Sequence, residues 1–533
     1  MSEPTHVDAL VVGAGVGGIY ATYRLTRLGL NVRCIDVAGD VGGTWYWNRY
    51  PGAMSDTESY LYRYSWDKED LQSYPWTHHY VYQPEILEYL RHVVRKHELR
   101  QYMQFNTEMT AAAWENGLQR WRITCATGGV YLARYLVNSL GLLSKANYPD
   151  INGMASFEGT LVHTAKWPTN LNLKGKTVGI IGNGSTGTQV MTAIAPIVAS
   201  LTSFQRNPQY SVPSGQKAIP DGYREAINER YDQIWEGVWA STVGFGVPES
   251  QRKTMEATPE ERQRAFQHVW DQGNGFRFMF SAFGDITTDR AANEEACNFI
   301  RSKIDETVKD PRKAKALKPT ELYARRPLCD TGYYEIFNQT NVDVIDLKQN
   351  AIKEIVPNGI KMADDTIHQL DVLVFATGFD AIEGSYMRVR ITGQNGARIQ
   401  DHWAHGPTAF GGIACSGFPN MYIIAGPQGP FANFPPVIES ETSFIISCIE
   451  YAEKNAQIME VAHDAERGWI DLCDKLVEGS LFKTAASWIF GTNVQGRAMS
   501  TNFYFGGLKN YLDWVKQEME AEFPGFNKTQ WKI

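Results

Sequence analysis

Two glycine-rich loops with the same spacing constrain the fold of this chain more than any other feature. Gly13–Gly18 and Gly182–Gly187 both have the pattern G-x-G-x-x-G and lie 169 positions apart. Each follows an apolar run (7–12 and 177–181) typical of a buried parallel strand, and each precedes a helical pattern. In such a strand–loop–helix unit, the backbone N–H groups at the start of the helix face a pyrophosphate. The sequence therefore predicts two dinucleotide-binding units.

The strand that follows each of these helices ends in a residue of opposite charge. Asp36 ends the segment 31–36, and Arg206 ends the segment 201–206. An acid at this position accepts a hydrogen bond from a free ribose 2′-hydroxyl, whereas an arginine attracts a 2′-phosphate. The sequence therefore predicts FAD in the first unit and NADPH in the second. The alternative is that the glycines serve only tight turns and packing, and that Arg206 is a solvated surface charge.

Size and composition narrow the class of protein. A chain of 533 residues is long enough for two or more domains, and a net charge of −8 favours neither nucleic acid nor an anionic membrane as a partner. No apolar run approaches the roughly 18–20 residues that span a bilayer, and the first strand begins too early to leave room for a signal peptide. The seven cysteines are scattered and form no C-x-x-C pair. We therefore expect a cytoplasmic protein without a redox disulfide; its oligomeric state stays open, and a monomer is consistent with the sequence.

The rest of the chain shows further strand and helix patterns before, between and after the two units. Alternating patterns predict strands at 121–125 and 131–137, and helical patterns occur at 84–97, 259–266, 293–307, 439–455 and 508–523. We expect an α/β fold with two doubly wound, Rossmann-like domains and a helical insertion. The expected parts are 1–145 and 380–533 for the FAD-binding domain, 146–221 and 326–379 for the NADPH-binding domain, and 222–325 for the insertion.

Four motifs resemble one enzyme family. Phe157–Pro168 has the pattern F-x-G-x-x-x-H-x-x-x-W-P and resembles, position for position, the fingerprint of type I flavin-dependent Baeyer–Villiger monooxygenases. Gly42–Asp56, Asp371–Asp380 and Ser487–Asn493 resemble further motifs of the same family, so the likeness extends over nearly the whole chain. It is stronger to the cyclohexanone and phenylacetone types than to the related N-oxygenating enzymes.

The chain also departs from the family pattern at several positions. Asp36 stands where glutamate is commoner, Arg325 where lysine is usual, and Met54-Ser55 where an Arg-Cys pair is common. Asn138–Gly141 replaces an A-T-G-like motif. None of these changes removes a group that the family's chemistry requires.

The resemblance implies an NADPH- and O₂-dependent flavoprotein that converts ketones, cyclic or aryl, to esters or lactones through a nucleophilic flavin peroxide. Arg326 corresponds to the family's active-site arginine, and Asp56 is expected to pair with it. Because a guanidinium stays protonated, Arg326 can stabilise an anion without acting as an acid. The alternative is that both residues belong to ordinary surface ion pairs.

The remaining site residues follow from the two loops and the resemblance. The expected FAD site comprises Gly13, Gly15, Gly18, Asp36, Gly43, Thr44, Trp45, Asp56 and Tyr62. The expected NADPH site comprises Gly182, Asn183, Gly184, Ser185, Thr186, Gly187, Thr188, Gln189, Arg206, Asn207, Arg325, Arg326 and Trp488. Arg206 and Arg325 are expected to hold the 2′-phosphate, and Ser185, Thr186, Thr188 and Gln189 to lie near the pyrophosphate or ribose. No metal ligands are expected.

Two further expectations leave alternatives open. The fingerprint places His163 between the two domains, where a structural or hinge role is favoured over acid–base catalysis. Five phenylalanines lie in segments that line the substrate pocket of relatives, although such residues are as often plain core: Phe276, Phe278, Phe280, Phe431 and Phe434.

Rival functions share parts of this plan. A related class of flavin monooxygenases oxygenates amine nitrogen or thioether sulfur, and the Trp167-Pro168 ending and the Asp56 motif argue against it. A disulfide reductase shares the two-dinucleotide plan but needs the C-x-x-C pair that this chain lacks. A non-enzymatic flavin sensor is the least favoured reading.

Overall fold

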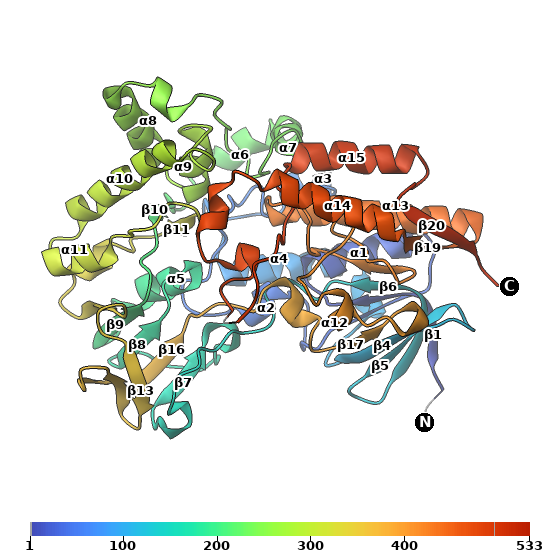
Figure 1. The fold of residues 1–533 in the computed structure, drawn as a ribbon, viewed down its shortest axis with the longest axis horizontal. Helices are drawn as coiled ribbons and strands as arrows, with labels where there is room; N and C mark the ends of the chain where they lie inside the picture. Colours follow the sequence, from blue (N-terminus) through green and yellow to red (C-terminus); the bar gives the residue numbers. More distant parts are fainter. Residues whose placement is uncertain (1–2, 495, 533) are drawn as a thin grey trace.

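Two sheets form the framework of the molecule in the computed structural model, which describes residues 3–494 and 496–532. In Figure 1 the larger sheet lies at the lower right and the smaller one at the lower left, and most of the insertion's helices lie above the smaller sheet. The segments between 380 and 505 run back across the middle of the view.

The larger sheet is built on the first glycine loop's unit. Its order is β17-β4-β5-β6-β1-β2-β3, and β18 also pairs with β6. The central strand β1 is parallel to both β2 and β6, whereas β5 is antiparallel to β4 and β6. The strands are β1 (Thr5–Val12), β2 (Val32–Ile35), β3 (Met103–Gln104), β4 (Met109–Glu115), β5 (Arg120–Cys125), β6 (Val130–Asn138), β17 (Arg390–Thr392) and β18 (Met421–Ile423).

The smaller sheet is built on the second loop's unit. Its order is β12-β9-β8-β16-β7, and every pair is parallel. The strands are β7 (Thr160–His163), β8 (Thr177–Ile181), β9 (Ser200–Gln205), β12 (Val342–Asp346) and β16 (Val372–Phe375). Both sheets therefore place a glycine loop at the carboxyl end of a central parallel strand, where ligands bind in doubly wound folds.

Three small sheets complete the strands. They are β10 (Ser211–Pro213) with β11 (Leu328–Asp330), β13 (Ile352–Val356) with β14 (Gly359–Met362) and β15 (Ile367–Gln369), and β19 (Gln457–Val461) with β20 (Phe526–Gln530). The parallel β10–β11 pair matters for the site, because Arg326 lies two residues before β11.

The helices cover both sheets. They are α1 (Val16–Arg27), α2 (Thr44–Trp47), α3 (Lys68–Ser73), α4 (Gln83–Lys96), α5 (Ser185–Ile194), α6 (Tyr223–Asn228), α7 (Tyr231–Trp239), α8 (Pro259–Gln272), α9 (Gly275–Ser281), α10 (Arg290–Thr307), α11 (Pro311–Leu317), α12 (Ile399–His402), α13 (Phe434–Asn455), α14 (His463–Leu476) and α15 (Leu508–Glu520). None of these helices of the described chain combines the length and apolarity needed to cross a membrane.

Two helix ends differ from expectation because of proline. The sequence predicts a helix from about Ser185 to Ile197, but α5 stops at Ile194, because the proline at 196 has no N–H to continue the helical hydrogen bonds. Helix α13 begins at Phe434, five residues earlier than expected, because its prolines fall in the first turn, where they are tolerated.

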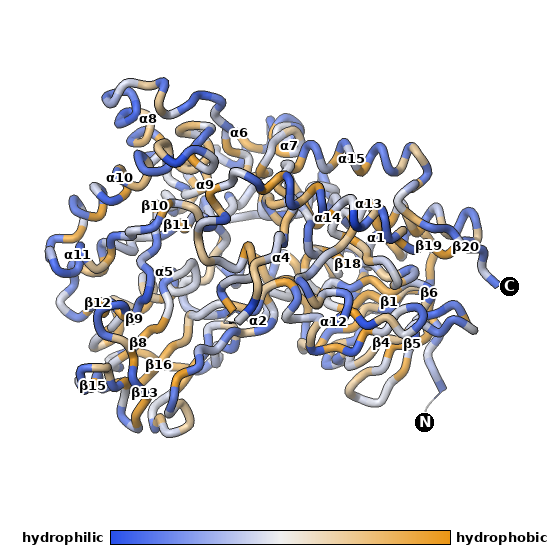
Figure 2. Tube along the Cα trace, in the orientation of Figure 1, coloured by the Kyte–Doolittle hydropathy of each residue, from blue (hydrophilic) through white to orange (hydrophobic). Residues whose placement is uncertain are grey.

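Hydrophobic residues on both faces of each sheet form the cores, and Figure 2 shows the hydrophobic colouring along the central strands. In β1, Ala9 and Val11 face one core while Leu10 and Val12 face another. The smaller sheet is likewise enclosed on both faces. Burial on both faces explains the continuous apolar runs before the glycine loops.

The helical insertion packs on both halves of the molecule. Helices α6 and α7 contribute Ile227, Tyr231, Trp235 and Val238 to the core beside the larger sheet, whereas α8–α11 join the core beside the smaller one. The segment after 380 also divides, because Phe482 and Phe490 pack in the smaller sheet's core. The fold class is thus confirmed as two Rossmann-like units with a helical insertion; the domain limits given above stay a prediction.

Candidate functional site

The two glycine loops have the same backbone design. Gly13 and Gly182 have φ values of 106° and 104°, and a Cβ atom at either would lie within 2.4 Å of a carbonyl oxygen on the neighbouring strand. At Gly184 a Cβ would meet no atom within 4 Å, so the space above the start of α5 is open. Helices α1 and α5 begin after glycine N-caps without a side-chain cap, which leaves their first N–H groups available to an anion. Both loops therefore fit a dinucleotide pyrophosphate.

Asp36 lies beside the first loop, as expected from its place at the end of β2. Its carboxylate accepts hydrogen bonds from the backbone N–H groups of Ala14 (2.5 Å) and Ala38 (2.7 Å), and only 8% of the residue is exposed. Burial raises the pKa of Asp36, and the two N–H donors partly offset this. The backbone of the loop thus holds the aspartate side chain, which is shorter than the glutamate commoner in the family. Its contact with a ribose stays a prediction.

The segment from Gly42 to Tyr62 closes over the first loop. The Gly42 N–H donates to the Ala14 carbonyl (2.9 Å), and Gly43 packs so closely on Gly15 that a Cβ at Gly43 would lie 2.8 Å from the Gly15 Cα. The Trp45 indole donates to the Tyr62 hydroxyl (3.0 Å). Thr44 is exposed at the start of α2. The structure therefore places Gly43 against the first loop and Trp45 beside Tyr62, and the contact of these residues with FAD stays a prediction.

The two arginines expected at the 2′-phosphate lie in different surroundings. Arg206 is exposed at the end of β9 and forms no salt bridge within the described residues. Arg325 instead pairs with the carboxylate of Glu321, and its Nε donates to the Ala486 carbonyl (3.0 Å). Arg325 is thus already engaged, because Glu321 stands four residues before it on the same segment.

Residues on and near helix α5 point in several directions. The hydroxyl of Thr188 is buried and donates to the Ser185 carbonyl (2.9 Å), so it faces the helix rather than the open side of the loop. Gln189 accepts from the Tyr50 hydroxyl (2.9 Å) and donates to the Met54 carbonyl (3.2 Å). Gln189 therefore joins the second unit to the segment before Asp56, which spacing within the loop could not reveal.

The side chain of Asn183 braces the strand end. Its Nδ2 donates to Gln205 Oε1 (2.9 Å) and to the Asn207 carbonyl (3.1 Å). These bonds hold the turn that carries Arg206 beside the second loop.

Arg326 and Asp56 form an ion pair at the junction of the two units. Arg326 Nη1 lies 2.5 Å from Asp56 Oδ2, although the residues are 270 positions apart, and it also donates to Ser185 Oγ at the start of α5 (3.3 Å). Burial lowers the pKa of Arg326, but the neighbouring Asp56 outweighs burial and the pKa is raised. The guanidinium is therefore a permanent positive charge between the two glycine loops.

Aromatic rings lie next to this charge. The Arg326 guanidinium carbon is 5.1 Å from the centre of the Phe276 ring, which stacks on Phe245 at 3.7 Å. Phe278 is fully buried among Phe266, Phe299 and Tyr323, which favours plain core, one of the two alternatives that the sequence left open for it. The rings around Phe278 come from α8, α10 and the segment after α11. Tertiary packing, and not the spacing of the phenylalanines in the sequence, determines which rings it meets.

The other expected pocket residues are partly buried. Phe431 packs against Phe503 and Phe505, and the Trp488 ring meets Phe503 edge-on at 5.6 Å. Phe280 and Phe434 are also partly buried and border the smaller sheet's core. Contact of any of them with substrate or nicotinamide stays a prediction.

His163 is buried (1% exposed) where β7 meets the segment after β16. Its Nδ1 accepts from the Ala165 N–H (3.1 Å), and its Nε2 lies 3.5 Å from the Thr377 hydroxyl. Burial lowers the pKa of His163 to about 4, while hydrogen bonds from the imidazole to the backbone of Asn147 and Gly378 act in the opposite direction. The imidazole is therefore neutral near pH 7, and its structural or hinge role stays a prediction.

Replacing His163 with glutamine should flatten the pH dependence of stability between pH 6.5 and 4. An unfolded histidine has a pKa of about 6.5, so in this interval the unfolded chain binds the extra proton and the folded chain does not. Wild-type stability should therefore fall as the pH drops through this interval, by up to about 3 kcal/mol from this residue, and be unaffected above it. Melting temperatures of the two proteins across pH 4.5–8 test this; parallel curves would contradict it.

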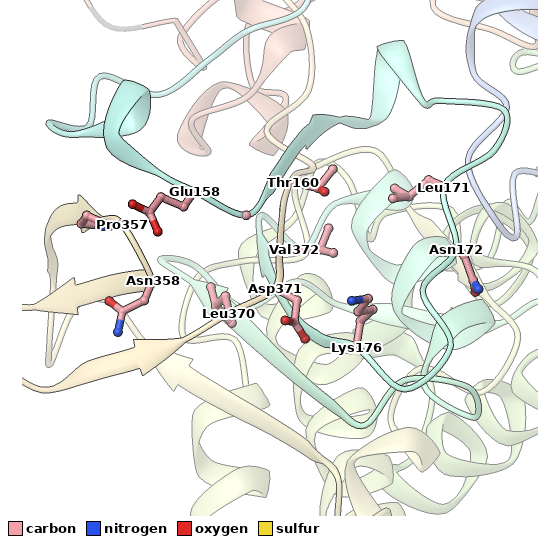
Figure 3. Close-up of a pocket in the computed structure, with 11 residues that line it drawn as sticks. Glu158, Thr160, Leu171, Asn172, Lys176, Pro357, Asn358, Leu370, Asp371 and Val372 are labelled. Atoms are coloured by element: carbon pink, nitrogen blue, oxygen red, sulfur yellow. The ribbon is translucent and has the colours of Figure 1, made fainter.

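A separate hollow lies at the opposite end of the smaller sheet (Figure 3). This cavity of about 440 Å³ is lined by residues at the amino ends of the strands, including Thr160, Lys176 and Val372. The second glycine loop follows the carboxyl end of β8, so the hollow is not the dinucleotide site.

A possible group of metal ligands also lies elsewhere, at His402, Cys415 and Glu466. Glu466 accepts hydrogen bonds from His402 (2.8 Å), the Thr408 hydroxyl (3.0 Å) and the Ser416 N–H (2.8 Å). These bonds satisfy the buried carboxylate without an ion.

One residue near the ion pair was not predicted from the sequence. Asn274 caps helix α9 and donates to the Asp56 carbonyl (3.1 Å). The Gly-Asn-Gly run at 273–275 before an aromatic segment was the available signal, because asparagine between glycines favours a turn that caps a helix.

Known proteins resemble this chain over nearly its full length. Residues 7–206 match the family described as flavin-binding monooxygenase-like. A phenazine N-monooxygenase of Lysobacter antibioticus is 45% identical over 98% of this chain and 97% of its own, and a cyclohexanone 1,2-monooxygenase of Acinetobacter sp is 45% identical over 99% and 97%. The structure of cyclohexanone monooxygenase from Rhodococcus sp. Phi1 bound to NADP+ superposes with a TM-score of 0.98, at 49% identity over 99% of this chain and 100% of that one.

Proposed function

The chain belongs to the flavin-dependent Baeyer–Villiger monooxygenases, and on that premise we propose that it uses FAD, NADPH and O₂ to convert cyclic or aryl ketones to esters or lactones. The observation that carries this proposal is the Arg326–Asp56 ion pair between the two glycine loops. When bound, reduced flavin would supply the two electrons that activate O₂, and one atom of that O₂ is the oxygen inserted beside the carbonyl while the other leaves as water.

The chain's own residues have two tasks in this reaction. The first loop with Asp36, Trp45 and Tyr62 would hold FAD, and the second loop with Arg206 and Asn207 would hold NADPH. Both bind their dinucleotide through backbone N–H groups at a helix start, which need no side-chain charge.

Arg326 supplies fixed positive charge where oxygen becomes negative during attack on a carbonyl. The Asp56 carboxylate and the Phe276 ring hold the guanidinium from two sides, so little reorganisation is needed as charge develops. Because the raised pKa keeps Arg326 protonated, it cannot donate a proton to the attacking oxygen. A protonated oxygen would be a poorer nucleophile toward a carbonyl carbon.

The substrate class follows from what surrounds this charge. Phe276 and Phe245 place stacked rings beside Arg326, and apolar walls exclude water from a reacting centre. An apolar ketone with one carbonyl suits such a site better than a charged substrate.

A panel of cyclic and aryl ketones tests the function. The purified protein should be yellow, and it should consume NADPH and O₂ in equal amounts only when ketone is present. The product should be heavier than the ketone by one oxygen atom, as measured by mass spectrometry. NADPH oxidation that no ketone stimulates would defeat the proposal.

Oxygenation of nitrogen or sulfur is the second candidate. It is favoured by the 45% identity to a phenazine N-monooxygenase, which equals the identity to the cyclohexanone monooxygenase. Incubation with a phenazine and with an aryl thioether would separate the two, since an N-oxide without any ester would reverse the order of the candidates.

We further propose that the protein works in the cytoplasm; its oligomeric state stays open, and a monomer is consistent with the sequence. All seven cysteines are buried free thiols, which suits a reducing compartment. Size-exclusion chromatography with light scattering would test the monomer against the chain mass of 60.0 kDa.

A further inference from the structure

Asn274 joins the two sides of the Arg326–Asp56 site through one buried amide. Its Nδ2 donates to the Asp56 carbonyl (3.1 Å) and to the Tyr80 hydroxyl (3.0 Å). Its Oδ1 accepts from the Phe276 N–H (2.8 Å) and the Arg277 N–H (3.4 Å). Only 2% of the residue is exposed, so the amide is fully used and shielded from water.

The backbone of Asn274 is held in a conformation that side chains rarely adopt. Its φ is 79° and its ψ is 119°, outside the small left-handed region that asparagine visits most readily. Strained backbone of this kind persists where the surroundings enforce it, and it concentrates at functional sites. Here the Asn274 N–H donates to the Pro213 carbonyl (2.8 Å), and its amide fixes both neighbouring segments.

Helix α9, which Asn274 caps, lies directly against the segment that carries Arg326. A Cβ at Gly275 would lie 2.6 Å from the Leu328 carbonyl oxygen and 2.9 Å from Pro327. One residue later, Phe276 places its ring beside the Arg326 guanidinium. The start of α9 therefore determines where Arg326 lies.

A second contact ties the same helix to the Asp56 side. Arg277 forms an ion pair with Glu58 (2.7 Å), and both side chains are largely buried. Burial lowers the pKa of Arg277, but Glu58 outweighs it and the pKa is raised. The Asn274 amide is the shorter link, because it reaches the backbone of Asp56 itself.

We propose that Asn274 is a positioning residue that keeps Asp56 and Arg326 in register, by tying the Asp56 carbonyl to the start of the helix that packs on Arg326. This inference rests on the proposed function. Asn274 touches neither reacting atom, so its loss should leave hydride transfer from NADPH intact. The displaced guanidinium would then stabilise negatively charged oxygen poorly. The two electrons taken from NADPH would pass to O₂ and leave with two protons as hydrogen peroxide, so that less ester forms per NADPH.

Asn274→Asp isolates the amide's donor. Aspartate has the same shape and still caps α9, but it cannot donate to the Asp56 carbonyl and places an oxygen opposite it. With cyclohexanone as the probe, we expect ester formed per NADPH to fall about tenfold, the effect of one lost hydrogen bond. Flavin reduction in single-turnover experiments should stay within about twofold of wild type, since the second glycine loop is untouched.

Asn420→Asp is the matched control. Asn420 is also buried (1% exposed) with a positive φ of 51°, and its Oδ1 accepts from the Met459 N–H in β19 (2.9 Å), not from a residue of the ion pair. It should lower the melting temperature without changing the ester yield per NADPH. Equal uncoupling in both variants would overturn the proposal in favour of general destabilisation.

Asn274→Gly is a second variant in case Asn274→Asp fails to fold, because glycine adopts φ 79° without strain. It should fold, bind flavin and uncouple like Asn274→Asp. Wild-type ester yield in either folded variant would overturn the positioning role.

A crystal structure of the Asn274→Asp holoenzyme gives a readout independent of the reaction. We expect Arg326 Nη1 and Asp56 Oδ2 to separate beyond about 4 Å, the limit of an ion pair. An intact pair would overturn the proposal. If wild type formed no ester at all, the proposed function would fail, and the Arg326–Asp56 separation alone would decide the role of Asn274.

Discussion

Replacing Arg326 with alanine is expected to abolish ester formation while NADPH still reduces the flavin. The substitution removes the fixed positive charge between the two glycine loops and leaves the loops themselves unchanged. Loss of a single preorganised electrostatic contact to a developing oxyanion lowers turnover by about a hundredfold to a thousandfold. It also leaves Asp56 without its partner, which adds an uncompensated buried carboxylate.

Two measurements made on the same protein separate these effects. Stopped-flow absorbance gives the rate of flavin reduction, and product mass gives the ester yield. Arg326→Lys should recover only part of the activity, because an ammonium cannot reproduce the planar guanidinium beside Asp56 and Phe276. The matched control is Arg312→Ala, which removes a surface arginine paired with Asp343 and should leave the ester yield unchanged. Ester formation at the wild-type rate in Arg326→Ala would remove this residue from the mechanism.

Replacing Arg206 with alanine should weaken the use of NADPH much more than the use of NADH. Arg206 is exposed at the strand end beside the second loop, and no described carboxylate neutralises it. A charge-assisted hydrogen bond to a phosphate contributes about 1.5–3 kcal/mol, so KM for NADPH should rise roughly tenfold to a hundredfold. NADH has no 2′-phosphate, so its KM should change by less than about twofold.

Arg325→Ala provides the comparison for this prediction. Because Arg325 is already paired with Glu321 and bound to the Ala486 carbonyl, its loss should cost less NADPH affinity than the loss of Arg206. Steady-state kinetics with both cofactors measure the two effects. An equal rise in KM for NADPH and NADH in Arg206→Ala would contradict the 2′-phosphate role.

The parts of the site that local sequence predicted are those that local backbone determines. A glycine loop, the strand before it and the charged residue at the end of the next strand lie within about 30 residues, and their geometry repeats in every βαβ unit. Both loops accordingly have a first glycine with a positive φ and a helix start without a side-chain cap. Arg326 and Asp56 are 270 positions apart, so spacing could not pair them, and only the family resemblance did.

The remaining features depend on packing between distant segments. The contact of Gln189 with Met54, the pairing of Arg325 with Glu321, and the tether from Asn274 to Asp56 each require the folded arrangement. Phe278 shows the same limit, since its alternation with Phe276 and Phe280 did not reveal that it faces the core. Helices α6 and α7 likewise pack beside the larger sheet, although in the chain they follow strands of the smaller one.

The link from Ser185 to Arg326 has a consequence for recombining this enzyme with its relatives. The ion-pair site is assembled from distant stretches of the chain. They include the start of α5, the segment that leads into β11, and the turn that caps α9. In a chimera whose crossover falls between these stretches, each half could still bind its nucleotide. The residues of the ion-pair site would then come from different parents and would not fit one another. Crossovers that exchange all of these stretches as one block would keep the site whole.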